Sequence, residues 1–273
     1  MPHAIWRGSI SFGLVTIPVS LLAAEQPRSL SFHMLDKRDL SPIRNRRVNE
    51  STGKEVDWEQ IVKGYEVSEG RFVVVTDDDL REANVEATQT IDVLAAVCAD
   101  EIHPELVSTP YYLQPEKAGR KAYLLLREAL KEAKRVAIAK IVIRTRQHLA
   151  ALIPDGDLLL LDVLRYPYEL RDPAELDLPG SDAKATKAAG ATQAEIDLAK
   201  QLVATISKPF DPEAKEYRDT YHDDLLALIE RKGAGQAPAP EPPPAAPKAG
   251  GEVVDIASLL KRSLDDAKKR KRA

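Results

Sequence analysis

The sequence contains few of the side chains that most catalytic and metal sites use. Its 273 residues include one cysteine, Cys98, and five histidines. Cys98 lies in an apolar stretch, so a disulfide within the chain is impossible and a small core residue is the expected role. No two histidines have the spacing of helical metal ligands, and no cysteine pair accompanies them. The sequence therefore predicts neither a metal site nor a cofactor.

Motifs for nucleotide binding and for acyl transfer are also missing. Gly53-Lys54 lies in "NESTGKEV", where the first glycine of a phosphate-binding loop is absent and Glu55 stands in place of its Ser or Thr. There is no Gly-x-Ser-x-Gly turn for a nucleophilic serine. A lysine could still form a Schiff base with an abasic sugar, because a lowered amine pKa is invisible in a sequence. We expect no catalysis, and such a lyase is the enzymatic alternative.

Long apolar runs are absent too. None is long enough to span a membrane, and the opening "MPHAIWRGSI" has neither the basic nor the apolar region of a signal peptide. The sequence thus predicts a cytoplasmic protein without a membrane partner.

Positive charge is concentrated in three stretches of a chain whose formal net charge is −4. Residues 28–47 hold six Lys or Arg and two Asp or Glu, residues 119–148 hold nine and two, and residues 261–273 hold seven and two. A chain that segregates charge in this way can present a basic surface despite an acidic pI. The alternative interpretation is that each run is a solvated helix face.

Hydrophobic periodicity indicates a β-rich first half. "ISFGLVTIPVSLLAA" predicts strands, with Pro18 favouring an edge or a strand start. A strand at 72–76 precedes the acidic residues 77–79, which suit a helix N-terminus. "QTIDVLAAV" is a further strand, and residues 119–135 have the spacing of an amphipathic helix. "VAIAKIVIRT" predicts a strand, and the turn at 154–157 predicts a hairpin.

The last third predicts helices and then a change in composition. "AEIDLAKQLVATI" forms one helix, and a second over about 213–231 would align four apolar or aromatic residues: Tyr217, Tyr221, Leu225 and Leu228. Residues 233–251 are rich in Gly, Ala and Pro and predict a disordered linker. Residues 252–273 combine a short amphipathic segment with a basic tail that we expect to be flexible.

The strip "SPIRNRRVNESTGKEV" joins a basic run to "ESTG", a plausible hairpin loop. In a strand, Arg44 and Arg46 would project on one face and Arg47 on the other. Guanidinium groups on an extended arm can contact successive phosphates without reading bases. Aromatic residues are only 5% of the chain, which disfavours stacking on single strands and favours the duplex backbone. For the tail, a solubilising end is the alternative to DNA contact.

Several segments resemble the bacterial Ku proteins of non-homologous end joining. They include "AIWRGSISFGLVTIPVSL", "SPIRNRRV", "GKEVDWEQIVKGYE", "VAIAKIVIRTRQHLAAL", "LRYPYELRDP" and "FDPEAKEYRDTYHDDLLALIE". The resemblance runs from about residue 2 to residue 232.

The resemblance implies an α+β, β-rich fold, in which a β-barrel core carries an inserted bridge arm and C-terminal helices. It also implies a ring-shaped homodimer that binds double-stranded DNA ends and recruits ATP-dependent DNA ligase D. The core would span 1–206 with the arm at about 30–60, and the helical region 207–232 would dock the ligase through Tyr217, Tyr221, Leu225 and Leu228. For that region, packing on its own barrel is the alternative. The DNA-contact candidates are basic residues of the three clusters and of the strip: Lys37, Arg38, Arg44, Arg46, Arg47, Lys54, Arg120, Lys121, Arg144, Arg146, Lys268, Lys269, Arg270, Lys271 and Arg272.

The chain departs from the resemblance at one point. Several relatives carry a Cys-x-x-Cys-Gly-Lys pattern on the arm, preceded by another Cys, whereas here the positions hold Asp39, Asn49 and Thr52. A metal knuckle cannot form, so we expect the arm to hold its shape by strand pairing and packing. A third class of function, an interaction module for acidic proteins or RNA, stays open on the residues alone.

Overall fold

The computed structural model describes residues 3–26, 30–83, 89–180, 183–235 and 256–270. The chain forms two compact units, Met1–Asp172 and Pro173–Ala273. The boundary expected from the sequence, at residue 206, lies within the second unit. Among the described residues, no helix has both the length and the apolar character that crossing a membrane requires.

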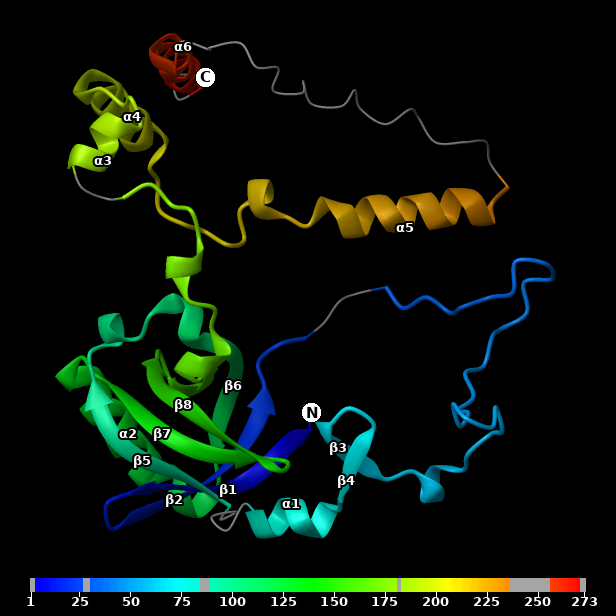
Figure 1. The fold of residues 1–273 in the computed structure, drawn as a ribbon. Helices are drawn as coiled ribbons and strands as arrows, with labels where there is room; N and C mark the ends of the chain where they lie inside the picture. Colours follow the sequence, from blue (N-terminus) through cyan, green and yellow to red (C-terminus); the bar gives the residue numbers. More distant parts are fainter. Residues whose placement is uncertain (1–2, 27–29, 84–88, 181–182, 236–255, 271–273) are drawn as a thin grey trace. The chain divides into compact units, whose positions relative to one another are not determined.

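A closed barrel of seven strands forms the centre of the first unit (Figure 1). Neighbouring strands follow the order β1-β2-β6-β9-β8-β7-β5, and only the pair that closes the barrel, β1 with β5, is parallel. The predicted β-barrel with helices is thereby confirmed. The strands are β1 (Ala4–Phe12), β2 (Val15–Ala23), β5 (Thr90–Val97), β6 (Val107–Pro115), β7 (Val136–Ile143), β8 (Arg146–Asp155) and β9 (Leu158–Leu164).

Most strand expectations are confirmed, including the β8–β9 hairpin around Gly156. The expectation for Pro18 is wrong. Strand β2 begins three residues earlier and has neighbours on both sides, with Pro18 opposite Ser9 of β1. The ladder with β6 starts only at Val19, opposite Pro115, so the missing N–H of Pro18 falls outside that ladder.

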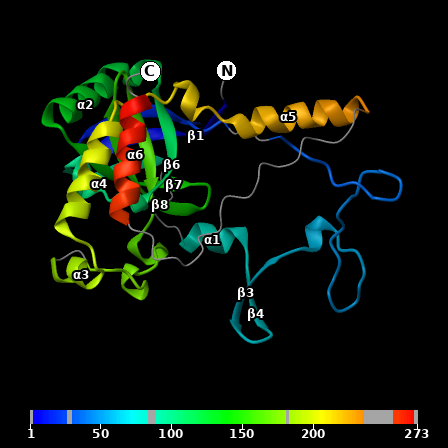
Figure 2. The ribbon, with the colours of Figure 1, turned by 90° about the horizontal axis from the view of Figure 1, so that it is seen from above.

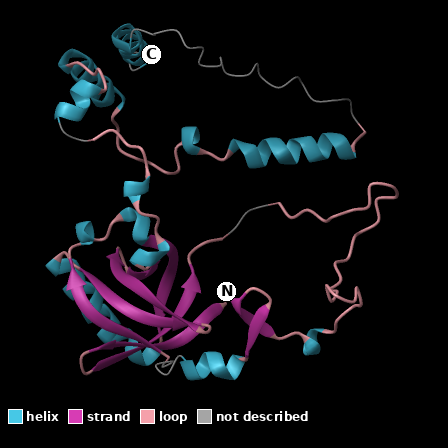
Figure 3. Ribbon diagram, viewed as in Figure 1, coloured by secondary structure: helices cyan, strands magenta, loops and turns pink. Residues whose placement is uncertain are grey.

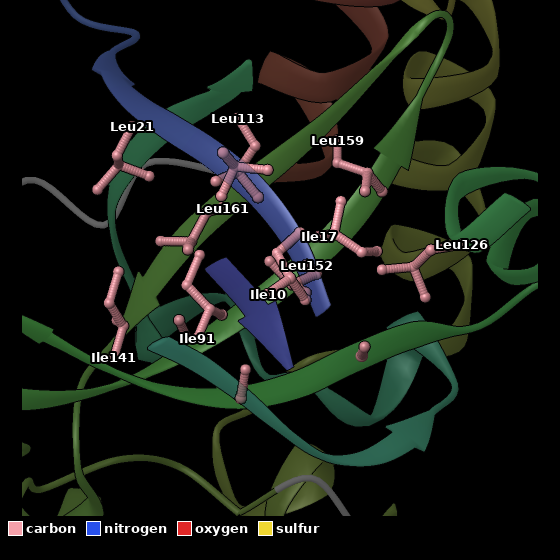
Figure 4. Packing of buried hydrophobic residues seen from close by; sticks show 14 of the residues in the cluster. Ile10, Ile17, Leu21, Ile91, Leu113, Leu126, Ile141, Leu152, Leu159 and Leu161 are labelled. Carbon is pink, nitrogen blue, oxygen red and sulfur yellow. The ribbon is translucent and has the colours of Figure 1, made fainter. Parts of the chain in front are cut away.

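The barrel interior holds the apolar side chains that alternate along its strands. Ile10, Ile17, Leu152 and Leu161 are fully buried there (Figure 4). The predicted amphipathic helix is confirmed as α2 (Arg120–Ala133), which adds three side chains to this core. These are Tyr123, Leu126 and Leu130.

The hydroxyl of Tyr123 joins α2 to two strands. It donates a hydrogen bond to the Leu113 carbonyl (2.9 Å) and accepts one from the Leu159 N–H (2.6 Å). Burial raises the pKa of this phenol. One side chain thus provides a hydrogen-bond partner to a buried backbone group on each of two strands.

The parallel seam of the barrel requires glycine at position 8. A Cβ there would lie 2.1 Å from the Gln89 carbonyl oxygen and 2.4 Å from the Trp6 ring. The next residue, Ser9, donates its N–H to the same carbonyl (2.9 Å). The backbone at Gly8 therefore lies directly against the backbone at Gln89, where β1 closes on β5, and a side chain at position 8 would not fit.

Asp162 is a buried charged residue on β9. Its side chain is 8% exposed, and among the described residues its Oδ1 has no hydrogen-bond partner. It lies in register with Ala151 of β8 and Pro110 of β6, on the opposite strand face from the core residues Leu161 and Val163. Burial raises the pKa of this carboxyl.

The second unit is helical, with α3 (Ala183–Ala188), α4 (Gln193–Ile206), α5 (Thr220–Gly233) and α6 (Ile256–Arg270). Helix α4 confirms the first helix predicted there. The second was expected over about 213–231, and its start is wrong. Asp219 caps α5 by accepting the His222 N–H (3.3 Å), and 215–217 forms a separate 3₁₀ turn.

The predicted linker, 233–251, falls largely outside the described residues; its first residue, Gly233, ends α5. The expectation of a flexible tail is wrong for Lys268 and Lys269. Both lie in α6, which continues to Arg270 because the preceding residues form an amphipathic helix and lysine is itself a good helix former. Lys271 and Arg272 lie outside the described residues.

Candidate nucleic-acid interface

The arm, defined here as residues 30–62, connects the barrel to a separate two-stranded sheet. That sheet pairs β3 (Lys63–Ser68) with β4 (Arg71–Val75) and is followed by α1 (Asp77–Ala83). Figure 3 shows the arm mainly as loop. The expectation that Arg44 and Arg46 lie in a strand is wrong, because the arm contains only two isolated bridges, Leu35 with Pro42 and Val48 with Glu55.

The expected hairpin loop is present at residues 50–53. The Asn49 side-chain oxygen accepts the N–H groups of Ser51 and Thr52 (both 3.0 Å) and the Thr52 hydroxyl (3.2 Å). Gly53 follows with a φ of +65°. The Asp39 carboxylate likewise accepts the N–H (3.0 Å) and the hydroxyl (2.7 Å) of Ser41. The positions without cysteine therefore close turns by hydrogen bonding, and the expectation of strand pairing along the arm is wrong.

Three arginines of the arm have partners. Arg38 contacts Asp36 (2.5 Å) and lowers the pKa of that carboxyl. Arg46 contacts Glu55 (3.0 Å), across the base of the hairpin loop. The guanidinium carbon of Arg47 lies 4.3 Å from the centre of the Trp58 ring. These contacts give each arginine a local structural role in addition to any role in binding.

Other cations of the arm are free within the part of the chain that the structure describes. Lys37, Arg44 and Lys54 are exposed and have no ion pair there. An exposed guanidinium without a carboxylate partner contributes its whole charge to the local potential. Arg44 is therefore the best phosphate-contact candidate on the arm.

The second basic cluster begins where α2 begins. Arg120 and Lys121 are exposed at its N-terminus, and α2 has no acidic residue in its first turn. Cations are unfavourable at this end of a helix because the helix dipole is positive there. Arg120 and Lys121 therefore do not stabilise the helix. An anionic ligand at this position would be favoured by both their side chains and the backbone N–H groups.

The β7–β8 turn carries the remaining two candidates of this cluster. Arg144 has a left-handed backbone, with φ of 60°, which is uncommon for a long side chain. Arg146 instead contacts Glu169 (2.5 Å), whose other oxygen accepts the Tyr166 N–H (2.8 Å). This N–H and the Arg146 guanidinium lower the pKa of Glu169. Arg146 is thus held by the loop after β9.

His148 lies beside these arginines. A hollow of about 570 Å³ is lined by Arg144, Arg146 and His148, together with Ile5 and Tyr111. Burial, followed by the neighbouring Arg146, lowers the pKa of His148. The imidazole is therefore largely neutral at pH 7 and adds little to the positive charge of this end of the barrel.

The candidates of the second unit separate into two sets. Lys268 and Lys269 are exposed on the last turns of α6, and Arg270 ends that helix. On α5, Tyr221, Leu225 and Leu228 share a face, as predicted. Tyr217 lies outside α5, in its own turn, where its ring centre is 5.3 Å from that of Phe210.

Sequence reasoning missed the apolar surface of the β3–β4 sheet. Tyr65, Phe72 and Val74 are 68%, 61% and 54% exposed, and no residue of either strand is fully buried. The signal was the run "RFVVV", which predicted a strand but did not indicate what would cover its apolar side chains. No group of three or more His, Cys, Asp or Glu side chains that could hold a metal occurs among the described residues.

Comparisons with known proteins agree with this architecture. Residues 11–198 match the family model "Ku70/Ku80 beta-barrel domain". The chain is 44% identical to the non-homologous end joining protein Ku of Cupriavidus necator, over 97% of this chain and 78% of that protein. It is 44% identical to the Ku protein of Opitutus terrae, over 96% and 91%, and 43% identical to that of Pseudomonas aeruginosa, over 97% and 88%.

Among solved structures, the SPOC domain of human PHD-finger protein 3 aligns with 60% of this chain and 97% of its own, at a TM-score of 0.31 and 14% identity. A similarity this low supports no conclusion. The family model covers more than half of the chain, and the three Ku relatives are more than 40% identical over nearly all of it. The chain belongs to the Ku family.

Proposed function

We propose that this chain binds the ends of double-stranded DNA without reading base sequence, as a ring-shaped homodimer in non-homologous end joining. The observation that carries the proposal is the set of exposed cations without carboxylate partners among the described residues, on the arm, at the start of α2 and at the β7–β8 turn. Membership of the Ku family and relatives named for end joining support it. We propose no catalytic role.

The chemistry of these groups suits a phosphate backbone. Arginine and lysine side chains neutralise phosphates and release counterions, which gives affinity that is independent of sequence and falls steeply with salt. Arg44, Arg120, Lys121 and Arg144 are the primary contacts in this proposal. Arg46 and Arg146 contribute less, because each already contacts a glutamate.

The apolar surface of the β3–β4 sheet supports the homodimer. An isolated two-stranded sheet is marginally stable in water, and this one exposes Tyr65, Phe72 and Val74. Tyr65 lies opposite Val73 on one face of this sheet, whereas Phe72 and Val74 lie on the other face. Apolar side chains exposed in this way are typical of an interaction site. A second copy that covers one of these faces would bury its apolar side chains and hold the arm in the closed ring.

A comparison of linear and closed DNA tests the ring. Fluorescence anisotropy would compare a linear duplex with a covalently closed circle of the same sequence, with light scattering to establish the dimer. We expect strong binding to the linear duplex only, because a closed ring needs an end to enter. Equal affinity for both would refute end threading, although duplex binding itself would stand.

Helix α5 is the proposed docking site for ATP-dependent DNA ligase D. Tyr221 is 72% exposed and Ile229 is 41% exposed. Its contacts with other described elements are too few to bury any of its residues. A pull-down would compare a chain that ends after Gly235, which keeps α5, with one that ends after Ser207. Ligase capture by the longer chain alone is expected, and equal capture would refute docking through α5.

A further inference from the structure

Helix α6 packs against α4 in the second unit. The two helices lie side by side in both ribbon views (Figures 1 and 2). Leu264 of α6, with 6% exposed, is the one buried hydrophobic side chain beyond residue 172 in the described part of the chain. The less exposed residues of α6 recur every three or four positions and form one stripe: Ala257, Leu260, Leu264 and Ala267.

Helix α4 presents a matching stripe. Ile196, Ala199 and Leu202 are half-buried at a spacing of three residues, whereas Val203 and Ile206 are each 60% exposed. A helix of 15 residues such as α6 is marginal in water by itself. Burial of Leu264 against α4 therefore stabilises α6 as a helix, and the stripe acts as a receptor for it.

This contact is incomplete at one end. A hollow of about 780 Å³ lies between the two helices, and it is lined by Thr205 and Ile206 of α4 and by Ser263 and Ala267 of α6, among others. A contact that fully buries a single leucine and leaves such a gap gains little free energy from burial. Helix α6 thus behaves as a weakly held ligand of α4 rather than as part of a fixed core.

The chain between α5 and α6 allows α6 to reach beyond its own copy. About 22 residues separate Gly233 from Ile256, and their contour length sets an upper limit of roughly 75 Å on the reach of α6. Every copy carries the same stripe and the same helix. The α6 of a neighbouring copy is therefore chemically equivalent to the chain's own.

We propose that the α4 stripe is a docking site through which copies exchange α6, so that α6 of one copy binds α4 of a second. Within one chain the tether gives α6 an effective concentration in the millimolar range. Copies held side by side on one duplex reach a comparable local concentration, a step that rests on the proposed DNA binding. Exchange of this kind links neighbouring copies without any new contact surface.

A crosslinking experiment tests the exchange. Two full-length variants in a Cys98→Ala background would carry Thr205→Cys or Ser263→Cys, whose positions line the same hollow, with tags of different mass. They would be mixed on a long linear duplex and treated with a bis-maleimide. We expect a covalent pair that contains one chain of each kind. Adding Leu264→Asp to the Ser263→Cys chain should reduce its yield about tenfold, because a charge at the buried position prevents docking.

The matched control is Leu259→Asp, since Leu259 is 45% exposed on the same helix, and it should leave the yield unchanged. A chain that carries both cysteines serves as a second control. If it crosslinks internally while the mixture gives no covalent pair, α6 docks only within its own chain and the exchange is overturned. Absence of both products would overturn docking itself. A mobility shift on the same samples reports DNA binding separately. Loss of DNA binding, which would refute the proposed function, can therefore be told apart from loss of α6 exchange.

Discussion

The barrel and the arm of the first unit reach a defined structure in opposite ways. In the barrel, contacts join residues far apart in sequence, as when Tyr123 of α2 meets Leu159 of β9. In the arm, the side chains of Asp36, Asp39 and Asn49 accept hydrogen bonds from residues two or three positions away. The barrel is therefore cooperative and depends on burial, whereas the arm is a series of local turns that tolerates exposure.

The largest expected effect is in the barrel core. Leu161→Ala removes part of a fully buried side chain, and we expect a loss of about 2–5 kcal/mol in the free energy of unfolding, from lost burial and the cavity left behind. Denaturant unfolding measures it. Leu124→Ala on α2, where the side chain is 50% exposed, is the matched control and should change stability little. Similar losses at both positions would contradict a core confined to the barrel interior.

Tyr123→Phe probes the polar contact inside the same core. It removes the hydroxyl that joins Leu113 and Leu159 and leaves the Leu159 N–H buried without an acceptor. We expect a cost of about 1–3 kcal/mol with unchanged barrel geometry. Denaturant unfolding and the near-ultraviolet spectrum together measure this, and a neutral result would show that water replaces the hydroxyl.

Asp162 makes the stability of the barrel depend on pH. Burial raises the pKa of its carboxyl in the folded state above the ordinary value of 3.8, so its favourable contribution is complete below that value and is lost as pH rises through the folded pKa. Asp162→Asn removes this loss. We expect a Tm at pH 7 that is about 2–4 °C higher than in the original chain, the shift that 1 kcal/mol gives in a unit of this size. The difference should disappear near pH 4. A lower Tm at pH 7 would instead indicate a cation beside Asp162.

The barrel was predictable because its signals are periodic. Alternation along residues 4–23, the "VAIAKIVI" run and the turn at Gly156 each indicated the element that forms. Pairing order was not predictable, because the parallel seam between β1 and β5 depends on a close approach at Gly8 rather than on a local pattern. The edge or strand start expected at Pro18 was wrong because β2 pairs on both sides and its ladder with β6 begins only at Val19.

The site was predictable as a set of charges but not as a geometry. The sequence identified Arg44, Arg46 and Arg146 as candidates, with Arg44 and Arg46 as the first two to test. Only the structure separates Arg44, which has no ion pair among the described residues, from the other two, which contact Glu55 and Glu169. Such pairings depend on turns and loops that bring distant residues together, as Arg146 and Glu169 show.

The smallest expected effect is on the arm. Asn49→Ala removes the oxygen that accepts the N–H groups of Ser51 and Thr52. If the arm is held by local turns, the free energy of unfolding of the barrel should change by less than about 0.5 kcal/mol, as for most exposed substitutions. Amide hydrogen exchange at Ser51 and Thr52 should nevertheless speed up by about threefold to tenfold, the equivalent of one net hydrogen bond.

Ser51→Ala is the control for this test, because it keeps the N–H that Asn49 accepts and should leave both measurements unchanged. The two readouts separate the regions directly. Faster exchange at the turn with unaltered global unfolding means that the arm opens independently of the barrel, as local contacts require. A loss of global stability from Asn49→Ala would mean that the arm and the barrel unfold as one cooperative unit. The two regions would then differ in amino-acid composition but not in how they are stabilised.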